Sequence, residues 1–226
     1  MTELNGILLI DKPKDWTSFD VVAKVRGALK KESGKKVKVG HTGTLDPLAT
    51  GLMIVVVGSY CKRASEFSKL DKTYEVTMKL GEISTTGDEE GEKTQVATLT
   101  PTDVQIKNAI AQFIGTIEQI PPAFSAIKID GKRAYKLARE GKEVKLKPRS
   151  VTIHNITGVK YDYPYVSFTA DVSSGTYIRS LVEDIGNELT TGAYMSDLRR
   201  TKVGEFSLTN EVLGPTETDS SQLVSA

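Results

Sequence analysis

Residues 40–51 read Gly-His-Thr-Gly-Thr-Leu-Asp-Pro-Leu-Ala-Thr-Gly and form the most unusual stretch of the chain. The glycines permit left-handed backbone angles and close backbone approach, and Pro47 keeps Asp46 out of helical geometry. The stretch therefore predicts an irregular loop that presents one carboxylate between two apolar segments. Such loops often carry active sites, although an isolated Asp-Pro more often braces a turn. No Gly-Lys-Ser/Thr follows at P-loop spacing, which excludes that kind of phosphate site.

The segments around this loop predict an irregular alternation of strands and helices. Apolar runs at 6–10 and 52–57 are typical of buried strands. Between them, Thr17-x-x-Asp20 resembles a capping box, and the apolar residues that then recur at helical spacing are Phe19, Val22, Val25 and Leu29. Further along we expect strands at 74–80, 151–161 and 166–172, and helices opening at Thr100-Pro101 and covering 176–189. This order indicates the α+β class, with a mixed, largely antiparallel sheet flanked by helices and basic loops.

The composition is that of an ordinary globular protein, with 226 residues of which 38% are hydrophobic and 26% charged. No apolar run approaches the roughly 20 residues that a bilayer-spanning helix needs, and the amino terminus lacks the features of a secretory signal. Cys61 is the sole cysteine, which excludes an internal disulfide, and His41 and His154 leave little for a metal site. We therefore predict a cytoplasmic protein that uses no metal and does not enter a membrane.

The net charge of +1 conceals two strongly basic segments. Lys24–Lys38 holds seven Lys or Arg and one acid, and Lys128–Arg149 holds nine Lys or Arg and three acids. Acids gather instead in Glu82–Glu92 and in Val203–Ala226, and the polar end of the chain predicts a flexible tail over 211–226. Basic segments suit a polyphosphate partner, because phosphate contacts release counterions, although solvated lysines also serve solubility alone.

The loop and five other segments resemble, in the same order, motifs of the TruB family of tRNA pseudouridine synthases. These segments are Gly6–Pro13, Lys72–Tyr74, Ile120–Lys128, Ser174–Arg179 and Leu198–Thr201. A motif of a dozen residues with ordered companions is specific, whereas one companion alone would be weak. The resemblance implies the pseudouridine synthase fold, with a catalytic domain over 1–210 that includes an RNA-gripping insertion at about 121–149. Family members commonly carry a further C-terminal domain, often of the PUA type, which this sequence is expected to lack.

The resemblance implies an activity, the isomerisation of uridine-55 in the TΨC arm of tRNA to pseudouridine. The bond between ribose C1′ and uracil N1 is cut, the base turns over, and C1′ is rejoined to C5 without a cofactor. By the resemblance Asp46 is the nucleophile, and the sequence leaves open whether it attacks C1′ or C6. Hydrolytic glycosidases usually need two carboxylates, whereas an isomerase that keeps its leaving base can work with one. The target base must be flipped out of a folded loop to be reached.

The resemblance also implies partners for Asp46. Arg179 is its expected ion-pair partner, although helical spacing alone favours a pair between Arg179 and Glu183. Tyr74 is expected to stack on the target uracil and help move the C5 proton, although a strand tyrosine usually packs in a core. The other expected substrate-binding residues are His41, which would occupy the space vacated by the flipped base, Lys62 at the rim, and Tyr177 and Leu198 in the pocket lining.

The expected partner is the T arm of tRNA, bound by one protein monomer. Residues 121–149 should grip it, and Lys24–Lys38 should lie beside the catalytic loop and contact phosphates. Two other functions fit parts of the sequence. A non-catalytic RNA-binding or RNA-folding module would share the fold, but it has no chemical need for Asp46, Tyr74 and Arg179 together. A small-sugar glycoside-processing enzyme would need a second carboxylate beside Asp46, and no motif supplies one.

Overall fold

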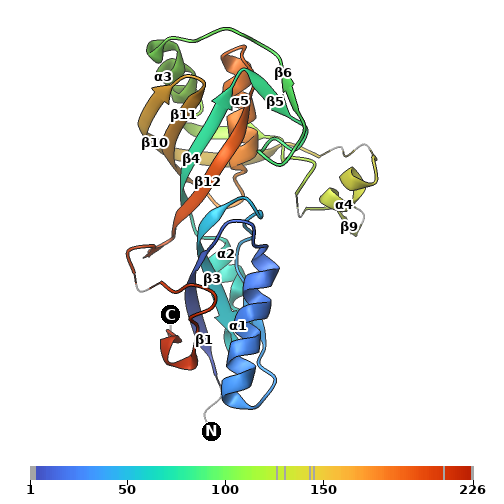
Figure 1. Cartoon of the computed structure of the whole chain (residues 1–226), viewed down its shortest axis with the longest axis vertical. Coiled ribbons are helices and arrows are strands. Elements are labelled where there is room, and N and C mark those ends of the chain that lie inside the picture. Colours follow the sequence, from blue (N-terminus) through green and yellow to red (C-terminus); the bar gives the residue numbers. More distant parts are fainter. Residues whose placement is uncertain are drawn as a thin grey trace. The chain divides into compact units, whose positions relative to one another are not determined.

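The protein consists of two compact units, seen in a computed structural model that describes residues 4–125, 127–129, 131–142, 144, 146–210 and 212–224. The first unit comprises Met1–Glu75 and Leu198–Ala226, and the second comprises Val76–Asp197. Strands β4 (Lys72–Leu80) and β12 (Ala193–Val203) supply residues to both units (Figure 1). Within the described residues, every helix is too short or too polar to cross a membrane.

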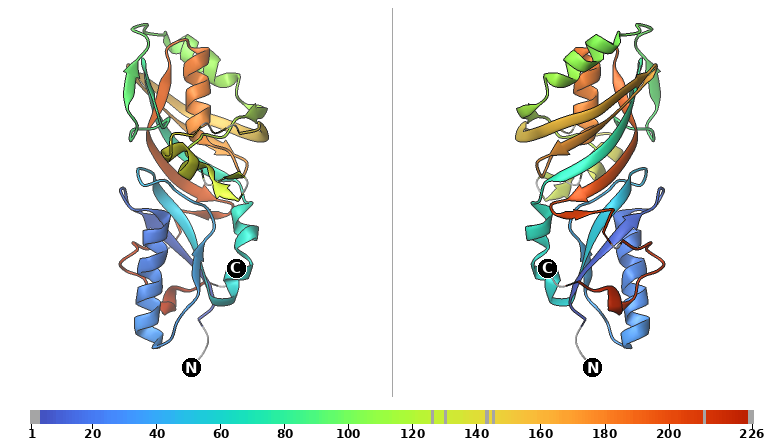
Figure 2. Two further views of the ribbon diagram at one scale, coloured as in Figure 1. Left: turned by 90° about the vertical axis from the view of Figure 1, so that its right-hand side faces the viewer. Right: turned by 90° about the vertical axis from the view of Figure 1, so that its left-hand side faces the viewer.

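The first unit is a small sheet with helices on both faces. Its strands are β1 (Gly6–Lys12), β2 (Val39–His41), β3 (Thr50–Val57), the end of β12, and β13 (Phe206–Ser207). Strands β1 and β2 pair antiparallel with β3, whereas β12 runs parallel to β3. Helix α1 (Ser18–Ser33) lies on one face, and α2 (Ala64–Ser68), which follows the short helix η1 (Gly58–Lys62), lies on the other (Figure 2).

Helix α1 begins where the capping-box motif predicts. Thr17 Oγ1 accepts a hydrogen bond from the backbone N–H of Asp20, and the Asp20 carboxylate accepts one from the backbone N–H of Thr17. Gly34, with a φ of 67°, ends the helix in the left-handed conformation. Of the apolar residues at helical spacing, Val22, Val25 and Leu29 are buried together with Val21, whereas Phe19 is 64% exposed. The capping signal therefore predicted the start of this helix correctly, but the expected place of Phe19 on its inner face was wrong.

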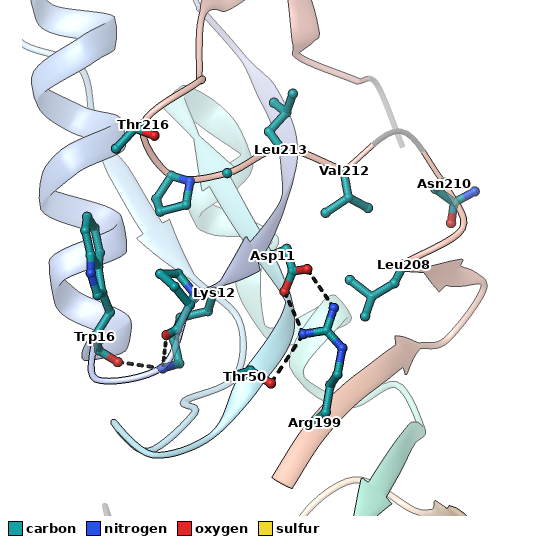
Figure 3. A pocket seen from close by; sticks show the side chains of 13 residues that line it. Asp11, Lys12, Trp16, Thr50, Arg199, Leu208, Asn210, Val212, Leu213 and Thr216 are labelled. Atoms are coloured by element: carbon teal, nitrogen blue, oxygen red, sulfur yellow. Dashed lines mark hydrogen bonds and ion pairs between the residues drawn. The ribbon is translucent and has the colours of Figure 1, made fainter. Parts of the chain in front are cut away.

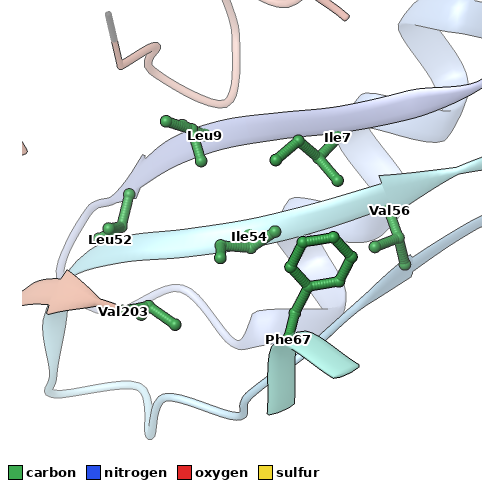
Figure 4. Packing of buried hydrophobic residues seen from close by; sticks show 7 residues of the cluster. All are labelled: Ile7, Leu9, Leu52, Ile54, Val56, Phe67 and Val203. Carbon is green, nitrogen blue, oxygen red and sulfur yellow. The ribbon is translucent and has the colours of Figure 1, made fainter. Parts of the chain in front are cut away.

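Both faces of the β1–β3 pair are buried. On one face, a cluster joins Phe67 of α2 and Val203 of β12 to alternate residues of the two strands, namely Ile7, Leu9, Leu52, Ile54 and Val56 (Figure 4). The residues between them, such as Leu8, Ile10 and Met53, are also fully buried. Because successive strand residues point to opposite faces, a strand covered on both sides is apolar throughout. This explains why the two runs lack any polar alternation.

The second unit is built on the strand order β4-β11-β10-β7, with β12 beside β4. The bounds are Gly115–Gln119 for β7, Arg149–Asp162 for β10 and Tyr165–Val172 for β11, and β10 pairs antiparallel with both neighbours. The helices are α3 (Asp103–Ala111), α4 (Ala134–Arg139) and α5 (Ile178–Glu188). Two small hairpins pair β5 (Glu82–Ser84) with β6 (Lys93–Gln95) and β8 (Lys128–Ile129) with β9 (Lys132–Arg133).

The α+β class with a mixed, largely antiparallel sheet is confirmed, since β3 and β12 form a parallel pair among antiparallel ones. One helix start differs from the prediction. Thr102, not Thr100, caps α3, because its Oγ1 accepts from the backbone N–H of Gln105. Pro101 thus precedes the cap instead of occupying the first turn. Strand β12 was not predicted, and it carries the Leu198–Thr201 motif.

The end of the chain differs from the flexible tail expected over 211–226. Residues 212–224, which we call the C-terminal strap, run along the outer edge of β1. Ile7 and Val224 exchange backbone hydrogen bonds of 2.9 and 3.0 Å, and Leu213 donates to Leu9 O at 3.1 Å. The short helix η2 (Ser220–Gln222) adds a bond from the Ser220 N–H to the Glu32 carboxylate on α1. An exposed strand edge needs such a cover, which a polar composition does not reveal.

Candidate active site

Asp46 lies on the loop that joins β2 to β3, in the first unit. The backbone N–H of Ala49 donates to Asp46 O at 3.1 Å, which closes a tight turn around Pro47. Leu45 and Leu48 are buried beside it, whereas the Asp46 side chain is half-buried. The apolar neighbours thus fasten the loop to the core, while Asp46 itself is less buried than they are.

Both neighbours of Asp46 are also held by hydrogen bonds. Ser18, the first residue of α1, donates from Oγ to Leu45 O at 2.9 Å and accepts from the Leu45 N–H at 2.8 Å. On the other side, Pro47 O accepts from the Asp15 N–H at 2.8 Å and from Lys12 Nζ at 3.2 Å. Fixing the backbone on both sides restricts where the Asp46 carboxylate can point. Such preorganisation is what a nucleophile requires.

Lys12, at the end of β1, is fully buried and was not assigned a role from sequence. Its ammonium group donates to three carbonyl oxygens, that of Pro47 and those of Pro13 at 3.0 Å and Trp16 at 2.6 Å, of which Figure 3 shows the latter two. Burial lowers the pKa of Lys12 to about 8, while the negative charge of Asp46 acts in the opposite direction. The structure therefore places a buried cation within electrostatic reach of the predicted nucleophile.

Arg200 on β12 contacts both ends of the loop that carries Asp46. Its side chain, only 2% exposed, donates from Nε to Leu52 O at 2.8 Å and from Nη2 to Gly43 O at 3.1 Å. The backbone of Arg200 pairs with Gly51, whose φ is 104°. A Cβ at Gly51 would lie 2.2 Å from Arg200 O, so only glycine allows this approach. Arg200 belongs to the Leu198–Thr201 motif, but the sequence did not predict that its side chain holds the loop.

A pocket of about 600 Å³ opens next to this frame, between the end of β1 and the residues after β13. Arg199 crosses it, donating to both Asp11 carboxylate oxygens at 3.1 and 2.7 Å and to Thr50 Oγ1 at 3.3 Å (Figure 3). The Asp11–Arg199 pair joins β1 to β12. The residues that line the pocket include Lys12 and Thr50 but not Asp46.

The other predicted residues of the first unit occupy different positions. Tyr74 on β4 and Leu198 on β12 are 9% and 8% exposed, which a core role would also explain. His41 ends β2 and is half-buried, four residues before Leu45. Lys62 is exposed and ends η1, beyond the Val57 end of β3 and thus at the opposite end of that strand from Thr50. No described contact brings Lys62 to the loop.

The first part of the basic segment Lys24–Lys38 lies on α1, whose first residue, Ser18, contacts the loop. Ser18 touches Leu45, but the helix rises about 1.5 Å per residue, so Lys30 and Lys31 are roughly 18 Å further along its axis. The expectation that the whole segment lies beside the catalytic loop is therefore wrong. A helix that starts at the loop necessarily carries its last turn away from it.

Arg179 lies in the second unit, in the first turn of α5, and is 6% exposed. Its guanidinium lies 3.4 Å from the Asp88 carboxylate and donates to Thr86 O at 3.1 Å and Phe124 O at 2.7 Å. Glu183 is the alternative partner of Arg179. Burial raises the pKa of Glu183, and the nearby positive charge of Arg179 partly opposes this rise. Asp88 was not identified from sequence because 91 residues separate it from Arg179. The pairing of Arg179 with Asp46 stays a prediction.

Tyr177 caps α5 and is held through its backbone. The buried Gln119 side chain accepts from the Tyr177 N–H at 2.8 Å and donates to Tyr177 O at 3.0 Å. Ser180 Oγ donates to Ile120 O at 2.8 Å. These bonds join the start of α5 to the end of β7, and they leave the Tyr177 side chain half-buried.

The predicted RNA-gripping insertion at 121–149 is described except for Ala126, Asp130, Glu143 and Lys145, which lie outside the described residues. It contains the β8–β9 hairpin and α4. Its exposed cations include Lys132, Lys136, Lys142, Lys147 and Arg149. In the part of the chain that the structure describes, no group of three or more His, Cys, Asp or Glu is placed to hold a metal ion.

Comparison with protein families finds two matches in this chain. Residues 30–178 match the model of the TruB family pseudouridylate synthase N-terminal domain. Residues 179–215 match that of the tRNA pseudouridylate synthase B C-terminal domain, so the second match begins at Arg179.

Whole-length relatives agree with these matches. The tRNA pseudouridine synthase B of Parabacteroides distasonis is 46% identical over 218 residues, which cover 94% of this chain and 91% of that protein. The protein of the same name from Chlorobaculum tepidum is 45% identical, covering 93% and 88%.

Solved structures share the fold. A crystal structure of a Cbf5-Nop10-Gar1 complex contains a chain with a TM-score of 0.71 and 29% identity. That match covers 92% of this chain and 52% of the other. An H/ACA RNP bound to a substrate RNA containing 2'-deoxyuridine gives a TM-score of 0.67 and 27% identity, covering 92% and 50%. The chain thus spans about half of each. The predicted pseudouridine synthase fold is confirmed.

Proposed function

Because the chain belongs to the TruB family of tRNA pseudouridine synthases, we propose that it converts uridine-55 of the TΨC arm of tRNA into pseudouridine, with Asp46 as its nucleophile. The observation that carries the assignment of Asp46 is the way its loop is held. Ser18 fixes Leu45, and Lys12 with the Asp15 N–H fixes Pro47. An aspartate that only braces a turn would not need hydrogen bonds that fix both the residue before it and the residue after it.

The reaction is an isomerisation that balances within the substrate. The Asp46 carboxylate attacks C1′ or C6 of the target nucleotide, and the C1′–N1 bond breaks. The freed uracil turns over, C5 bonds to C1′, C5 loses its proton and N1 takes one up. The carboxylate is then released unchanged, so no co-reactant is consumed. One carboxylate suffices because the leaving base stays in the site and water does not replace it.

The surrounding residues have roles that follow from their chemistry. Lys12 is a positioning residue, because it holds the Pro47 carbonyl and places positive charge near Asp46. Arg179 pairs with the Asp46 carboxylate, and Tyr74 stacks on the target uracil and assists removal of the C5 proton. His41, Lys62, Tyr177 and Leu198 contact the flipped nucleotide or the RNA beside it. The exposed cations of residues 121–149 bind phosphates of the T arm and position it.

Incubation of the full chain with a T-arm stem-loop RNA, followed by mapping of pseudouridine, tests the proposal. Asp46→Asn should abolish product while changing the Kd for RNA less than about threefold, because the amide keeps the size but not the nucleophilicity. Asp197→Asn, at an exposed carboxylate on β12, serves as the matched control and should retain full turnover. Turnover by Asp46→Asn would overturn the assignment.

The same experiment separates the rival functions. A non-catalytic RNA-folding module would bind the stem-loop and give no pseudouridine with the unsubstituted chain. A glycoside-processing enzyme would act without RNA and would release a free base or sugar. Product at a uridine other than position 55 would keep the chemistry but contradict the proposed site.

A further inference from the structure

An exposed stripe on α1 lies outside the site described above. Phe19, Ala23, Arg26 and Lys30 follow one another at spacings of four, three and four, so they share one face of the helix. Phe19 is 64% exposed, among the most exposed large hydrophobic side chains in the described chain. A single exposed apolar side chain is common on protein surfaces, so what distinguishes Phe19 is the cation held beside its ring.

Arg26 is fixed beside the Phe19 ring. Its guanidinium carbon lies 5.9 Å from the ring centroid, and Nη2 donates to Val39 O on β2 at 3.1 Å. The ring and the cation thus form a cation–π pair held by a backbone carbonyl. Lys30 continues the stripe and is exposed, and Lys38, which is also exposed, directly precedes Val39 in the chain.

The stripe carries positive charge without an acid of its own. Helix α1 has two carboxylates: that of Asp20 accepts from the backbone N–H and Oγ1 of Thr17, and that of Glu32 accepts from the backbone N–H of Ser220. A protein partner of an exposed phenylalanine would be expected to bring an apolar groove, which gains nothing from the flanking cations. A nucleic acid satisfies both features, because its bases stack on aromatic rings and its phosphates bind Arg and Lys.

The stripe is also connected to the catalytic loop. Phe19 directly follows Ser18, whose hydroxyl holds both the N–H and the C=O of Leu45. Leu45 is the neighbour of Asp46. An RNA segment that is bound at Phe19 is therefore close in the structure to the loop that presents the nucleophile.

We propose that Phe19 and Arg26 form an accessory RNA-binding platform. A base of the substrate RNA other than the target uridine stacks on Phe19, while Arg26 and Lys30 bind the adjoining phosphates. The inference rests on the proposed function, since it takes the substrate to be tRNA, and it adds a contact surface that neither Asp46 nor residues 121–149 provide.

Binding of a full-length tRNA transcript and of the T-arm stem-loop to the full chain, measured at several salt concentrations, tests the platform. Phe19→Ala should weaken binding of at least one of these RNAs roughly 5- to 100-fold, as the loss of one base–aromatic stack does. Phe19→Tyr should restore binding, whereas Phe19→Leu, which keeps apolar bulk but no ring, should not. Lys30→Gln should lower the salt slope by about one.

Val104→Ala on α3 is the matched control, because Val104 is 65% exposed and its loss should leave binding unchanged. Equal Kd values for the unsubstituted chain and Phe19→Ala, with pseudouridine still formed, would overturn the platform alone. Full binding by Phe19→Leu would also overturn it, since an apolar contact would then suffice. Failure of the unsubstituted chain to bind either RNA would overturn the platform together with the proposed function.

Discussion

At the scale of single residues, Lys12 shows how a buried charge is kept. Its ammonium group has three donors and meets three carbonyl oxygens, of Pro13, Trp16 and Pro47. Burial nevertheless disfavours the charged form, which is why its pKa falls to about 8. Burying the charged ammonium group of Lys12 thus costs free energy. In return, its hydrogen bond to Pro47 O stabilises the loop on which Asp46 lies.

The lowered pKa of Lys12 predicts that the stability of the protein depends on pH. The pKa of Lys12 is lower in the folded chain than the ordinary value of 10.5, so the unfolded chain binds more protons between pH 8 and 10.5. The contribution of Lys12 to the free energy of unfolding should therefore rise across that window. Lys12→Met should lower the free energy of unfolding by about 2 kcal/mol at pH 7, because three carbonyls lose their donor.

The deficit of Lys12→Met should widen between pH 8 and 10.5, because the variant lacks the gain that Lys12 gives, whereas the gain from Lys72, whose pKa burial also lowers to about 8, is common to both chains. Urea unfolding at several pH values measures it, with Lys24→Met on the exposed side of α1 as the control. A deficit that stays constant or narrows with rising pH would show that Lys12 is not the buried cation described.

At the scale of elements, the parallel contact between β3 and β12 holds the loop in place. Gly51 and Arg200 are paired backbone to backbone, while the Arg200 side chain reaches Gly43 O and Leu52 O. The two ends of the catalytic loop are thereby connected through one residue of a strand that lies about 150 residues further along the chain.

A methyl group at Gly51 should therefore disrupt this contact. In Gly51→Ala the new Cβ would lie 2.2 Å from Arg200 O at a φ of 104°, so strand and loop must move. We expect a loss of about 3 kcal/mol or more in the free energy of unfolding, and a fall in turnover larger than the fall in RNA affinity. Gly27→Ala in α1 is the control, since a Cβ there meets nothing within 4 Å and should stabilise the helix slightly.

The same contact shows where sequence reasoning reaches its limit. Capping and periodicity predicted α1, and unbroken apolar runs predicted β1 and β3, because those signals are local. The pattern of β12 is dominated by polar and charged residues, and Arg200 is buried only because carbonyls from a distant segment accept its hydrogen bonds. The loop by itself is more typical of an aspartate that braces a turn, and the role of Asp46 stays a prediction from the family resemblance, whereas its supports Lys12 and Arg200 needed the fold.

At the scale of the whole molecule, the start and the end of the chain meet in the first unit. The C-terminal strap adds backbone hydrogen bonds along β1, at Ile7, Leu9 and Asp11. The strap is polar and acidic, so it lacks the hydrophobic pattern that would predict a strand. Its backbone hydrogen bonds to β1 leave no pattern of their own in the sequence. The strap covers the edge of the sheet from which the Lys12 support emerges.

Removal of the strap should therefore cost stability and uncover that edge. A chain that ends at residue 212 loses the pairs of Leu213 with Leu9 and Asp11 and those of Val224 with Ile7. We expect its free energy of unfolding to fall by about 2–4 kcal/mol and its β1 edge to promote self-association. Chemical denaturation and light scattering measure both effects. A chain that ends at residue 222 keeps the Leu213 pairs and should be intermediate, whereas equal stability of all three chains would show that the strap contributes nothing to the fold.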